Sequence, residues 1–286
     1  MKRIAVIPNT LRDIGYTETK KVVKYLLDMS CEIFFEDIHK DELSELGSTV
    51  SFVSRDTLFS VTDFIIALGG DGTIIEIAVD AAKYSKPIVG INMGTLGFLT
   101  QIEKGDFSAL KDIVDGKFSV TKCMMLDIEI ISENGEVIGE YRALNDLIVT
   151  GSSYKMITTA THIDGTSMGK HSADGIIVST AIGSTAYSLS AGGAVMHPEV
   201  DAMIITPICP HTLKARSTVI PAESIVEITI EQPFKTKAVV RTDGNIIYEI
   251  TDNMDKIRVK KSKYSTLLIK LESTNFFDVL RNKLSD

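Results

Sequence analysis

The stretch DFIIALGGDGTIIEIA, residues 63–78, decides the fold of the N-terminal part of the chain. Residues 63–68 are nearly all apolar, which is typical of a parallel strand that is covered on both faces. Glycines follow this run, and a helical pattern begins near Thr73. Because ligand sites in open parallel sheets lie at the carboxyl ends of the strands, this turn is a candidate site.

Asp71 is the unusual residue of the turn. The neighbouring Gly69, Gly70 and Gly72 permit positive φ and the close approach of a ligand, and the amides of the next helix favour an anion. The turn is not a Walker A loop, since no lysine and hydroxyl follow in register. A carboxylate would weaken a site for phosphate alone, so Asp71 fits a role toward a hydroxyl or toward magnesium. The alternative is a helix N-cap.

Strand and helical patterns alternate through the first hundred residues. Strand patterns cover residues 3–8, 31–36, 63–70 and 86–92, and helical patterns cover residues 17–29 and 73–84. This alternation predicts an α/β domain with a parallel sheet and helices on its faces, which we assign to residues 1–100.

Strand patterns separated by turn signals dominate residues 101–271 and predict a second, β-rich domain. Residues 275–284, NFFDVLRNKL, are helical in pattern again. We expect this C-terminal helix to pack back on the first domain, so that residues 272–286 return to it.

Composition excludes several classes of protein. The 286 residues carry 30 basic and 38 acidic side chains, a net charge of −8, which argues against a general nucleic-acid binder. Cys31, Cys123 and Cys209 are few, odd in number and far apart, which argues against a disulfide framework and fits a reducing cytosol. The apolar run after Met1 is too short for a signal peptide, and none approaches the ~20 residues of a membrane span. We therefore predict a soluble, cytoplasmic protein that does not bind membranes.

Further polar turns follow the GGDGT turn along the chain. A second glycine turn, GINMGTLGFLT, spans residues 90–100, and its Phe98 is either a flat face for a base or a core residue. Residues 171–198 are dense in small and hydroxyl side chains, which suits either a ligand lying on the backbone or a close helix–strand crossing. Asp243 and Asn245 occupy a hairpin-like turn. No serine-nucleophile elbow and no metal-binding histidine spacing is present.

In this order, GGDGT, NMGTLGFLT, an Asn–acid pair, ADGIIVSTAIGSTAYSLSAGG, ITPICPHTL and TDGN resemble the ATP-dependent NAD kinases. The resemblance runs from about Asp63 to the C-terminus. It implies an enzyme that transfers the γ-phosphoryl of ATP to the 2′-hydroxyl of the adenosine ribose of NAD, giving NADP. It also implies a β-sandwich C-terminal domain, NAD bound between the domains, magnesium with ATP, and a homodimer or homotetramer in which a neighbouring subunit completes the site.

The resemblance also assigns residues. Asp71 matches the proton acceptor, with Gly72 beside the dinucleotide, and Asn145 and Asp146 match a pair that contacts NAD. Lys155 lies where members carry a basic residue near the dinucleotide. The remaining matches are the ribose-binding Asp174, the segment that wraps the adenosine (Thr185, Ala186, Tyr187, Ser188, Leu189 and Ser190, with Tyr187 as a stacking face), and Asn245, where some members have glutamine.

The sequence departs from the family pattern at several positions. Asp146 replaces the usual glutamate, and Ala181 and Ile182 replace a proline and a threonine. Ser172 stands where members often have an arginine, and we expect Lys170 or His171 to compensate for the lost cation. A lipid or sugar kinase of the same superfold and a non-catalytic NAD-binding protein remain alternatives. A dehydrogenase does not, because residues 6–15 lack the dinucleotide fingerprint.

Overall fold

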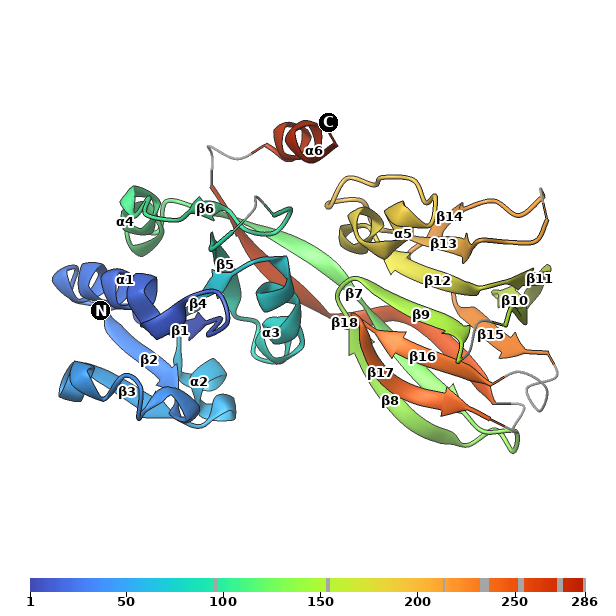
Figure 1. Ribbon diagram of the computed structural model, residues 1–286, viewed down its shortest axis with the longest axis horizontal. Coiled ribbons are helices and arrows are strands. Elements are labelled where there is room, and N and C mark those ends of the chain that lie inside the picture. The colour runs from blue at the N-terminus through green and yellow to red at the C-terminus, as the bar shows by residue number, and fades with distance from the viewer. Residues whose placement is uncertain are drawn as a thin grey trace. The chain divides into compact units, whose positions relative to one another are not determined.

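The computed structural model describes residues 1–94, 97–152, 155–212, 214–231, 237–251, 255–271 and 275–284 (Figure 1). The chain forms two compact units. The first comprises residues 1–122 and 266–286, and the second comprises residues 123–265. None of the described helices is long and apolar enough to cross a membrane.

The first unit is built on a parallel sheet, which confirms the predicted α/β domain. Its strands follow the order β3-β2-β1-β4-β5, and β6 and the end of β18 also pair with β5. The strands are β1 (Arg3–Pro8), β2 (Glu32–Glu36), β3 (Val50–Val53), β4 (Phe64–Gly69), β5 (Pro87–Asn92), β6 (Ile102–Glu103) and β18 (Lys256–Lys270). The pairings among β1 to β6, and that of the end of β18 with β5, are parallel. The carboxyl ends of β1, β4 and β5 therefore meet at one edge of the sheet.

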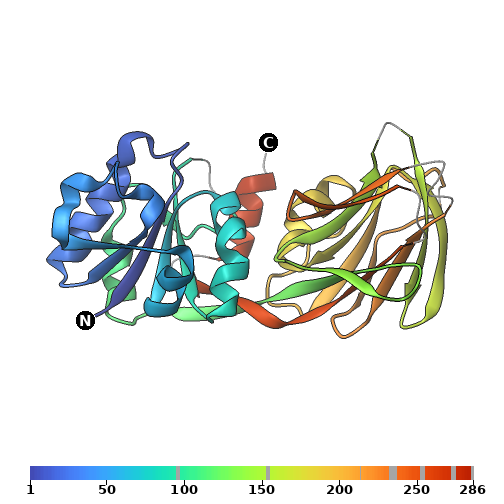
Figure 2. The ribbon, with the colours of Figure 1, turned by 90° about the horizontal axis from the view of Figure 1, so that it is seen from below.

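Helices cover both faces of this sheet (Figures 1 and 2). They are α1 (Thr17–Asp28), α2 (Arg55–Val61), α3 (Asp71–Lys83) and α4 (Ser108–Val114), and the C-terminal α6 (Phe276–Leu284) belongs to the same unit. Buried residues of α1 and α4 share a core with Ile4, Val6 and Ile66. Helices α2 and α3 contact each other and cover the opposite face of the sheet (Figure 1). The strand side chains that alternate with Ile4, Val6 and Ile66 point toward that face.

The first unit continues beyond residue 100, where the alternating pattern stops. It includes β6 and α4, since Leu110 and Ile113 of α4 are fully buried in its core. Residues 101–118, which their position in the strand-rich region assigned to the second domain, thus pack in the first. The unit ends inside β7 (Ser119–Ile131), because β7 and β18 are long strands whose two ends belong to different units.

Helix α6 contacts the second glycine turn. The ring centroids of Phe276 and Phe98 lie 6.5 Å apart, and the ammonium group of Lys283 lies 5.9 Å from the centre of the Phe98 ring. These contacts confirm that the C-terminal helix packs back on the first unit, although residues 272–274 and 285–286 lie outside the described residues. Phe98 is thus partly covered by α6.

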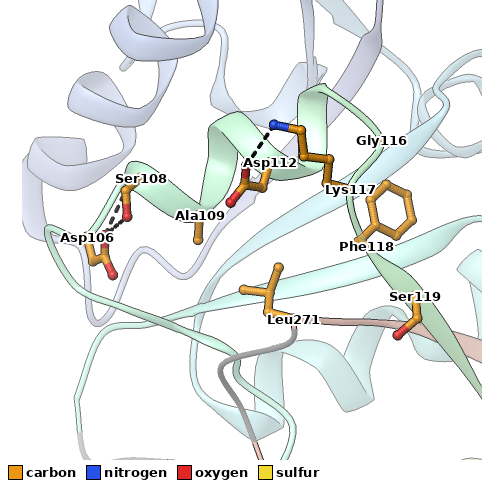
Figure 3. A pocket seen from close by; sticks show the side chains of 9 residues that line it. All are labelled: Asp106, Ser108, Ala109, Asp112, Gly116, Lys117, Phe118, Ser119 and Leu271. Carbon is orange, nitrogen blue, oxygen red and sulfur yellow. Dashed lines mark hydrogen bonds and ion pairs between the residues drawn. The ribbon is translucent and has the colours of Figure 1, made fainter.

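A cavity of about 770 Å³ lies beside α4 in the first unit (Figure 3). It is lined by Asp106, Ser108, Ala109, Asp112, Gly116, Lys117, Phe118, Ser119 and Leu271. Asp106 accepts hydrogen bonds from the amide and the hydroxyl of Ser108, and Lys117 lies 3.5 Å from Asp112. Asp106 therefore lies just before the start of α4, and Asp112 and Lys117 lie near its end.

The second unit is a sandwich of two antiparallel layers, as predicted. One layer contains β11, β10, β15 and β18 with β7 and β8, and the other follows the order β14-β13-β12-β9-β16-β17. Its elements are β7, β8 (Val137–Ala143), β9 (Asp146–Gly151), β10 (Ile157–Ile163), β11 (Thr166–Ala173), β12 (Gly175–Thr180), α5 (Tyr187–Ser190), β13 (Ala202–Ile208), β14 (Thr218–Pro221), β15 (Val226–Ile230), β16 (Ala238–Thr242), β17 (Asn245–Ile250) and β18.

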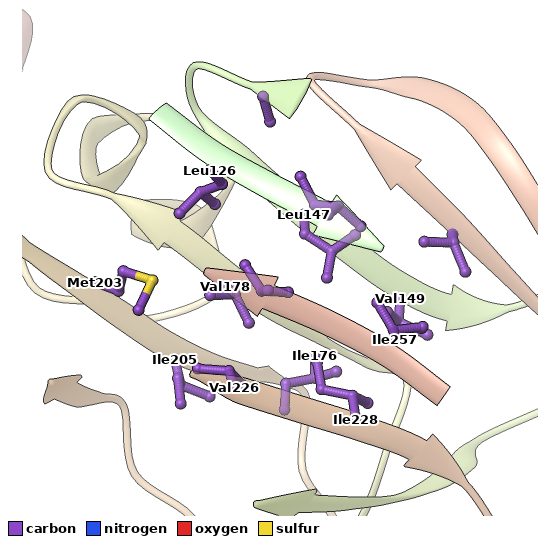
Figure 4. Close-up of a cluster of buried hydrophobic side chains, with 14 of the residues drawn as sticks. Leu126, Leu147, Val149, Ile176, Val178, Met203, Ile205, Val226, Ile228 and Ile257 are labelled. Atoms are coloured by element: carbon purple, nitrogen blue, oxygen red, sulfur yellow. The ribbon is translucent and has the colours of Figure 1, made fainter. Parts of the chain in front are cut away.

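Side chains from both layers form one apolar core in the second unit (Figure 4). Leu126, Val226 and Ile257 come from one layer and pack with Leu147 and Val178 of the other. Residues of one strand face alternately into and out of this core, so the strands alternate between buried apolar and more exposed positions, as in β15. The core holds the turns at the ends of β9, β12 and β16 in fixed positions.

Candidate functional site

Asp71 connects the two glycine turns of the first unit. It is the first residue of α3, the N-cap is Gly70, and no side-chain bond caps the helix. The Asp71 carboxylate instead accepts hydrogen bonds from the amides of Phe98, at 2.8 Å from Oδ2, and Leu99, at 2.9 Å from Oδ1. The N-cap alternative is therefore wrong, because this side chain fixes a loop 27 residues away in sequence.

Close packing explains two of the glycines in these turns. A Cβ on Gly97 would overlap Oδ1 of Asp71, and a Cβ on Gly69 would overlap Oγ1 of Thr73. A Cβ on Gly72 would meet no atom within 4 Å. Gly72 therefore borders open space next to Asp71, where a ligand has room.

The loop that follows β1 reaches the same edge of the sheet and was missed by sequence reasoning. The Asn9 amide donates to Leu68 O at 2.8 Å, and the Asn9 carboxamide donates to Thr73 Oγ1 at 3.1 Å. The guanidinium of Arg12 in this loop lies beside Gly70 and Gly94. The sequence offered one signal for these residues, which is that Asn9 to Arg12 directly follow a predicted strand. That strand, β1, neighbours β4 in the sheet.

Asp243 holds the Asn145–Asp146 turn of the second unit. Its carboxylate accepts hydrogen bonds from the amides of Leu144 at 2.8 Å, Asn145 at 2.7 Å and Asp146 at 3.3 Å. The Asp243 amide in turn donates to Asp146 O at 3.2 Å. Sequence reasoning placed Asp243 in a hairpin turn but missed this role, since the contact joins residues almost a hundred positions apart.

Residues at the end of β12 hold the turn from another side. The carbonyl oxygen of Asn145 accepts hydrogen bonds from the Thr180 amide at 2.9 Å and from the Ser179 hydroxyl at 3.1 Å. A Cβ on Gly183 would overlap this carbonyl, so glycine is required there. The backbone of the Asn145–Asp146 turn is thus fixed, whereas none of the hydrogen bonds described for it uses the two side chains.

Asp146 is a buried residue whose carboxyl group has no bonding partner among the described residues. It is 3% exposed, and burial, with repulsion from Asp243, raises its pKa to about 7. Burial also raises the pKa of Asp243, although its three backbone hydrogen bonds oppose that change. In the part of the chain that the structure describes, no donor or cation meets the Asp146 carboxyl group. It therefore presents a group that both donates and accepts hydrogen bonds near neutral pH.

This pKa predicts that Asp146→Asn stabilises the protein at alkaline pH. In the unfolded chain Asp146 ionises near ~3.9, but in the folded chain it ionises near 7. The folded state binds more protons between these values, so its stability falls as pH rises through this window and stays lowered above it. The difference in unfolding free energy between variant and wild type should grow by about 2–4 kcal/mol from pH 4 to pH 8. Urea unfolding at both pH values measures it.

Asp146→Glu is the matched control, because it keeps an ionisable group at this position and should keep the pH dependence. An unfolding free-energy difference between Asp146→Asn and wild type that is equal at pH 4 and pH 8 would contradict the raised pKa.

The segment from Thr185 to Ser190 forms a tight turn and the short helix α5. The Thr185 hydroxyl donates to Ile182 O at 3.1 Å, and the buried Ser188 hydroxyl shares a hydrogen bond of 2.9 Å with Thr206. Tyr187 and Ser190 are exposed, whereas Ala186 and Leu189 are half-buried. The Tyr187 ring and the Ser190 hydroxyl are thus the most accessible parts of this segment.

The remaining predicted residues, Asn245, Asp174 and Lys155, lie at opposite ends of the strands of the second unit. Asn245 pairs with Thr242, which pairs with Leu147, so Asn245 lies at the end that holds Asn145 and Asp146. Asp174 precedes β12 and lies about 17 Å along this strand from the residue paired with Asp146. Ile157 pairs with Ala173, so the exposed Lys155 extends from the same end as Asp174.

Position 172, where the resemblance leads one to expect an arginine, is preceded by two basic residues, Lys170 and His171. The Ser172 hydroxyl shares a hydrogen bond of 2.8 Å with Thr158. Lys170 lies on the same face of β11, but its ammonium group is paired with Glu231 at 3.0 Å. His171 points to the opposite face, because side chains alternate along a strand. Lys170 thus lies on the same face of β11 as Ser172 and forms an exposed ion pair, whereas His171 lies on the other face.

Comparison with known proteins identifies the family. The profile of the ATP-NAD kinase N-terminal domain matches residues 4–118, and that of the ATP-NAD kinase C-terminal domain matches residues 144–271. The chain belongs to the NAD kinase family. The NAD kinase of Caldanaerobacter subterraneus subsp. tengcongensis is 40% identical over the whole of both chains, and that of Acetivibrio thermocellus is 37% identical over 100% of this chain and 98% of its own.

Two solved NAD kinase-family structures share the fold. An NAD kinase from Archaeoglobus fulgidus in complex with ATP has a TM-score of 0.76 and 28% identity, covering 98% of each chain. Yeast NADH kinase complexed with NADH has a TM-score of 0.86 and 21% identity, covering 99% of this chain and 87% of its own. The α/β unit and the β-rich unit are thus both those of NAD kinases.

Proposed function

We propose that the chain transfers the γ-phosphoryl group of ATP to the 2′-hydroxyl of the adenosine ribose of NAD, with Asp71 as the proton acceptor. The products are NADP and ADP. Membership of the NAD kinase family supports the reaction, and the position of Asp71 supports its role. The observation that carries this assignment is the Asp71 carboxylate fixed between two glycine turns by the amides of Phe98 and Leu99.

Asp71 acts by orientation and by late proton transfer. Phosphoryl transfer depends mostly on positioning and charge stabilisation, and a sugar hydroxyl is too weak an acid to lose its proton before the reaction begins. Two backbone donors fix the plane of the Asp71 carboxylate, and each oxygen keeps lone pairs to accept the hydroxyl proton. Asp71 thus orients the hydroxyl and takes its proton as the new oxygen–phosphorus bond forms. The open space beside Gly72 admits the ribose.

The second unit supplies contacts to NAD. Asp243 and the end of β12 fix the turn that presents Asn145 and Asp146, whose side chains we assign to hydrogen bonds with NAD. Asn145 and Asn245 lie at the same end of the strands. The exposed Tyr187 ring offers a stacking face to the adenine, and the segment from Thr185 to Ser190 offers its backbone.

Lys155 and Asp174 support an oligomeric enzyme. They extend from the opposite end of the strands, about 17 Å from the residue paired with Asp146. We therefore assign them to the NAD site of a neighbouring subunit in a homodimer or homotetramer. We also place the enzyme in the cytoplasm, which the few, widely spaced cysteines favour.

Magnesium fits this chain as an ion that accompanies ATP. Among the described residues, no group of three or more His, Cys, Asp or Glu side chains is placed to hold a metal. Mg²⁺ in kinases is commonly held by substrate phosphates, water and one or two carboxylates, so a dedicated cage is not required. Bound in this way, the ion would neutralise phosphate charge, and Asp71 is the carboxylate that the two glycine turns contain.

A panel of acceptors tests the proposal. The purified protein is incubated with ATP and Mg²⁺ and, in parallel, with NAD, a diacylglycerol or a hexose, and ADP formation is followed in each mixture. We expect ADP to form only in the mixture that contains NAD, and we expect the amount of NADP formed there to equal the amount of ADP. ADP formation that depends on the lipid or the sugar would contradict the proposal, as would binding of NAD without any turnover of ATP.

A further inference from the structure

Arg12 is fixed by its backbone at the edge of the sheet that carries Asp71. The Arg12 amide donates to Asn9 O at 3.0 Å and to Asn9 Oδ1 at 3.2 Å. The next residue, Asp13, is buried and accepts hydrogen bonds from the amides of Glu18 and Thr19 at the start of α1. The loop is thus anchored on both sides of Arg12, whose side chain is exposed.

The guanidinium of Arg12 lies against both glycine turns. Its Nη1 atom is 3.5 Å from the position that a Cβ on Gly70 would take and 2.5 Å from the position that a Cβ on Gly94 would take. A side chain at Gly94 would therefore push the guanidinium away. Gly70 directly precedes Asp71, so the guanidinium lies next to the turn that presents the proton acceptor.

The charge of Arg12 has no partner among the residues that the structure describes. In the described ranges, its guanidinium forms no ion pair or hydrogen bond, although the chain has a net charge of −8. The carboxylate of Asp71 is occupied by the amides of Phe98 and Leu99 rather than by Arg12. An arginine that is anchored, unpaired and next to glycine backbone is suited to bidentate contact with phosphate oxygens.

We infer that Arg12 binds the polyphosphate of ATP and positions the phosphoryl donor for the reaction at Asp71. This inference rests on the proposed function. The tail of ATP carries about four negative charges near neutral pH, and the Asp71 carboxylate repels it. Arg12 offsets this repulsion at the turn itself. The diphosphate of NAD carries fewer charges, so the cation serves the donor more than the acceptor.

Binding measurements on charge variants test the inference. Isothermal titration with Mg–ATP, tripolyphosphate, AMP and NAD compares wild type with Arg12→Gln. Lys24→Gln, on the exposed side of α1, is the matched control because it removes one positive charge from the same unit. We expect Arg12→Gln to weaken Mg–ATP and tripolyphosphate binding by roughly tenfold to a hundredfold. Binding of NAD should change by less than threefold, and Lys24→Gln should bind every probe like wild type.

Gly94→Ala tests the geometry without removing the charge. The added methyl group would lie 2.5 Å from Nη1, and the far end of a flexible side chain can move away, so we expect the fold to be retained. We expect weaker Mg–ATP binding in Gly94→Ala, and little further loss when it is combined with Arg12→Gln. Steady-state kinetics of Arg12→Gln should show a raised KM for ATP and a KM for NAD near that of wild type.

The outcomes separate this inference from the proposed function. If wild type forms NADP and Arg12→Gln binds Mg–ATP and tripolyphosphate as wild type does, the inference is overturned and the function stands. The inference is also overturned if Arg12→Gln loses affinity for NAD or AMP as strongly as for ATP. If binding of Mg–ATP depends on Arg12 but no NADP forms, the inference holds and the proposed function fails.

Discussion

Asp71→Asn should reduce the rate of NADP formation by about a thousandfold, within the range that a lost proton acceptor produces. The amide cannot take the hydroxyl proton. It also presents an NH₂ group to the amide of either Phe98 or Leu99, each of which donates to a carboxylate oxygen in the wild type. We expect folding to survive, with a loss of stability of about 1–2 kcal/mol from one unpaired amide. Steady-state rates and thermal unfolding measure the two effects separately.

Glu76→Gln is the charge-matched control for Asp71→Asn. Glu76 lies on the same helix, is exposed, and should tolerate the change with a rate near that of wild type. Affinities for ATP and NAD in Asp71→Asn should stay within a few-fold of wild type, so that the loss lies in turnover. A turnover within tenfold of wild type would remove Asp71 from the role of proton acceptor.

Asp243→Ala should destabilise the second unit by about 3 kcal/mol or more and weaken NAD binding. The substitution leaves the amides of Leu144, Asn145 and Asp146 without their common acceptor, and unpaired buried amides each cost about 1–3 kcal/mol. The turn that presents Asn145 and Asp146 then loses its fixed conformation. Denaturant unfolding and titration with NAD measure the two losses.

Asp164→Ala is the matched control, because Asp164 occupies an equivalent turn. Both aspartates have φ near +49° and precede a glycine in a hairpin, so both substitutions carry the same backbone strain. Asp164 is exposed and accepts a bond from the single amide of Ile225 at 2.8 Å. We expect a loss of about 1–2 kcal/mol and unchanged NAD affinity. Equal losses in the two variants would show that strain, rather than the three hydrogen bonds, explains the effect.

The sequence predicted the elements that depend on local pattern. The apolar run before Gly69 and the helical period after it predicted β4 and α3, and alternation with turn signals predicted the strands of the sandwich. Local pattern did not predict membership of α4 in the first unit. Burial of Leu110 and Ile113 decides that, and burial depends on neighbours that are distant in sequence.

The parts of the candidate site that escaped prediction are long-range contacts. Asp71 was predicted as a site residue, but its bonds to Phe98 and Leu99 depend on how two turns meet at one sheet edge. Asp243 was predicted only as a turn residue, although it fixes Asn145 and Asp146. Arg12 was not selected at all. Sequence spacing gives residue types and strand ends, whereas these contacts follow from the order of strands in the sheet.

Product analysis tests the central claim most directly. The wild-type protein is incubated with NAD, ATP and Mg²⁺, and the products are separated and examined by ³¹P NMR. We predict one NADP for each ATP consumed, with the new phosphorus present as a monoester at the 2′ position of the adenosine ribose, and almost no product from Asp71→Asn. Consumption of ATP without NADP, or a phosphate on any other position of NAD, would contradict the account.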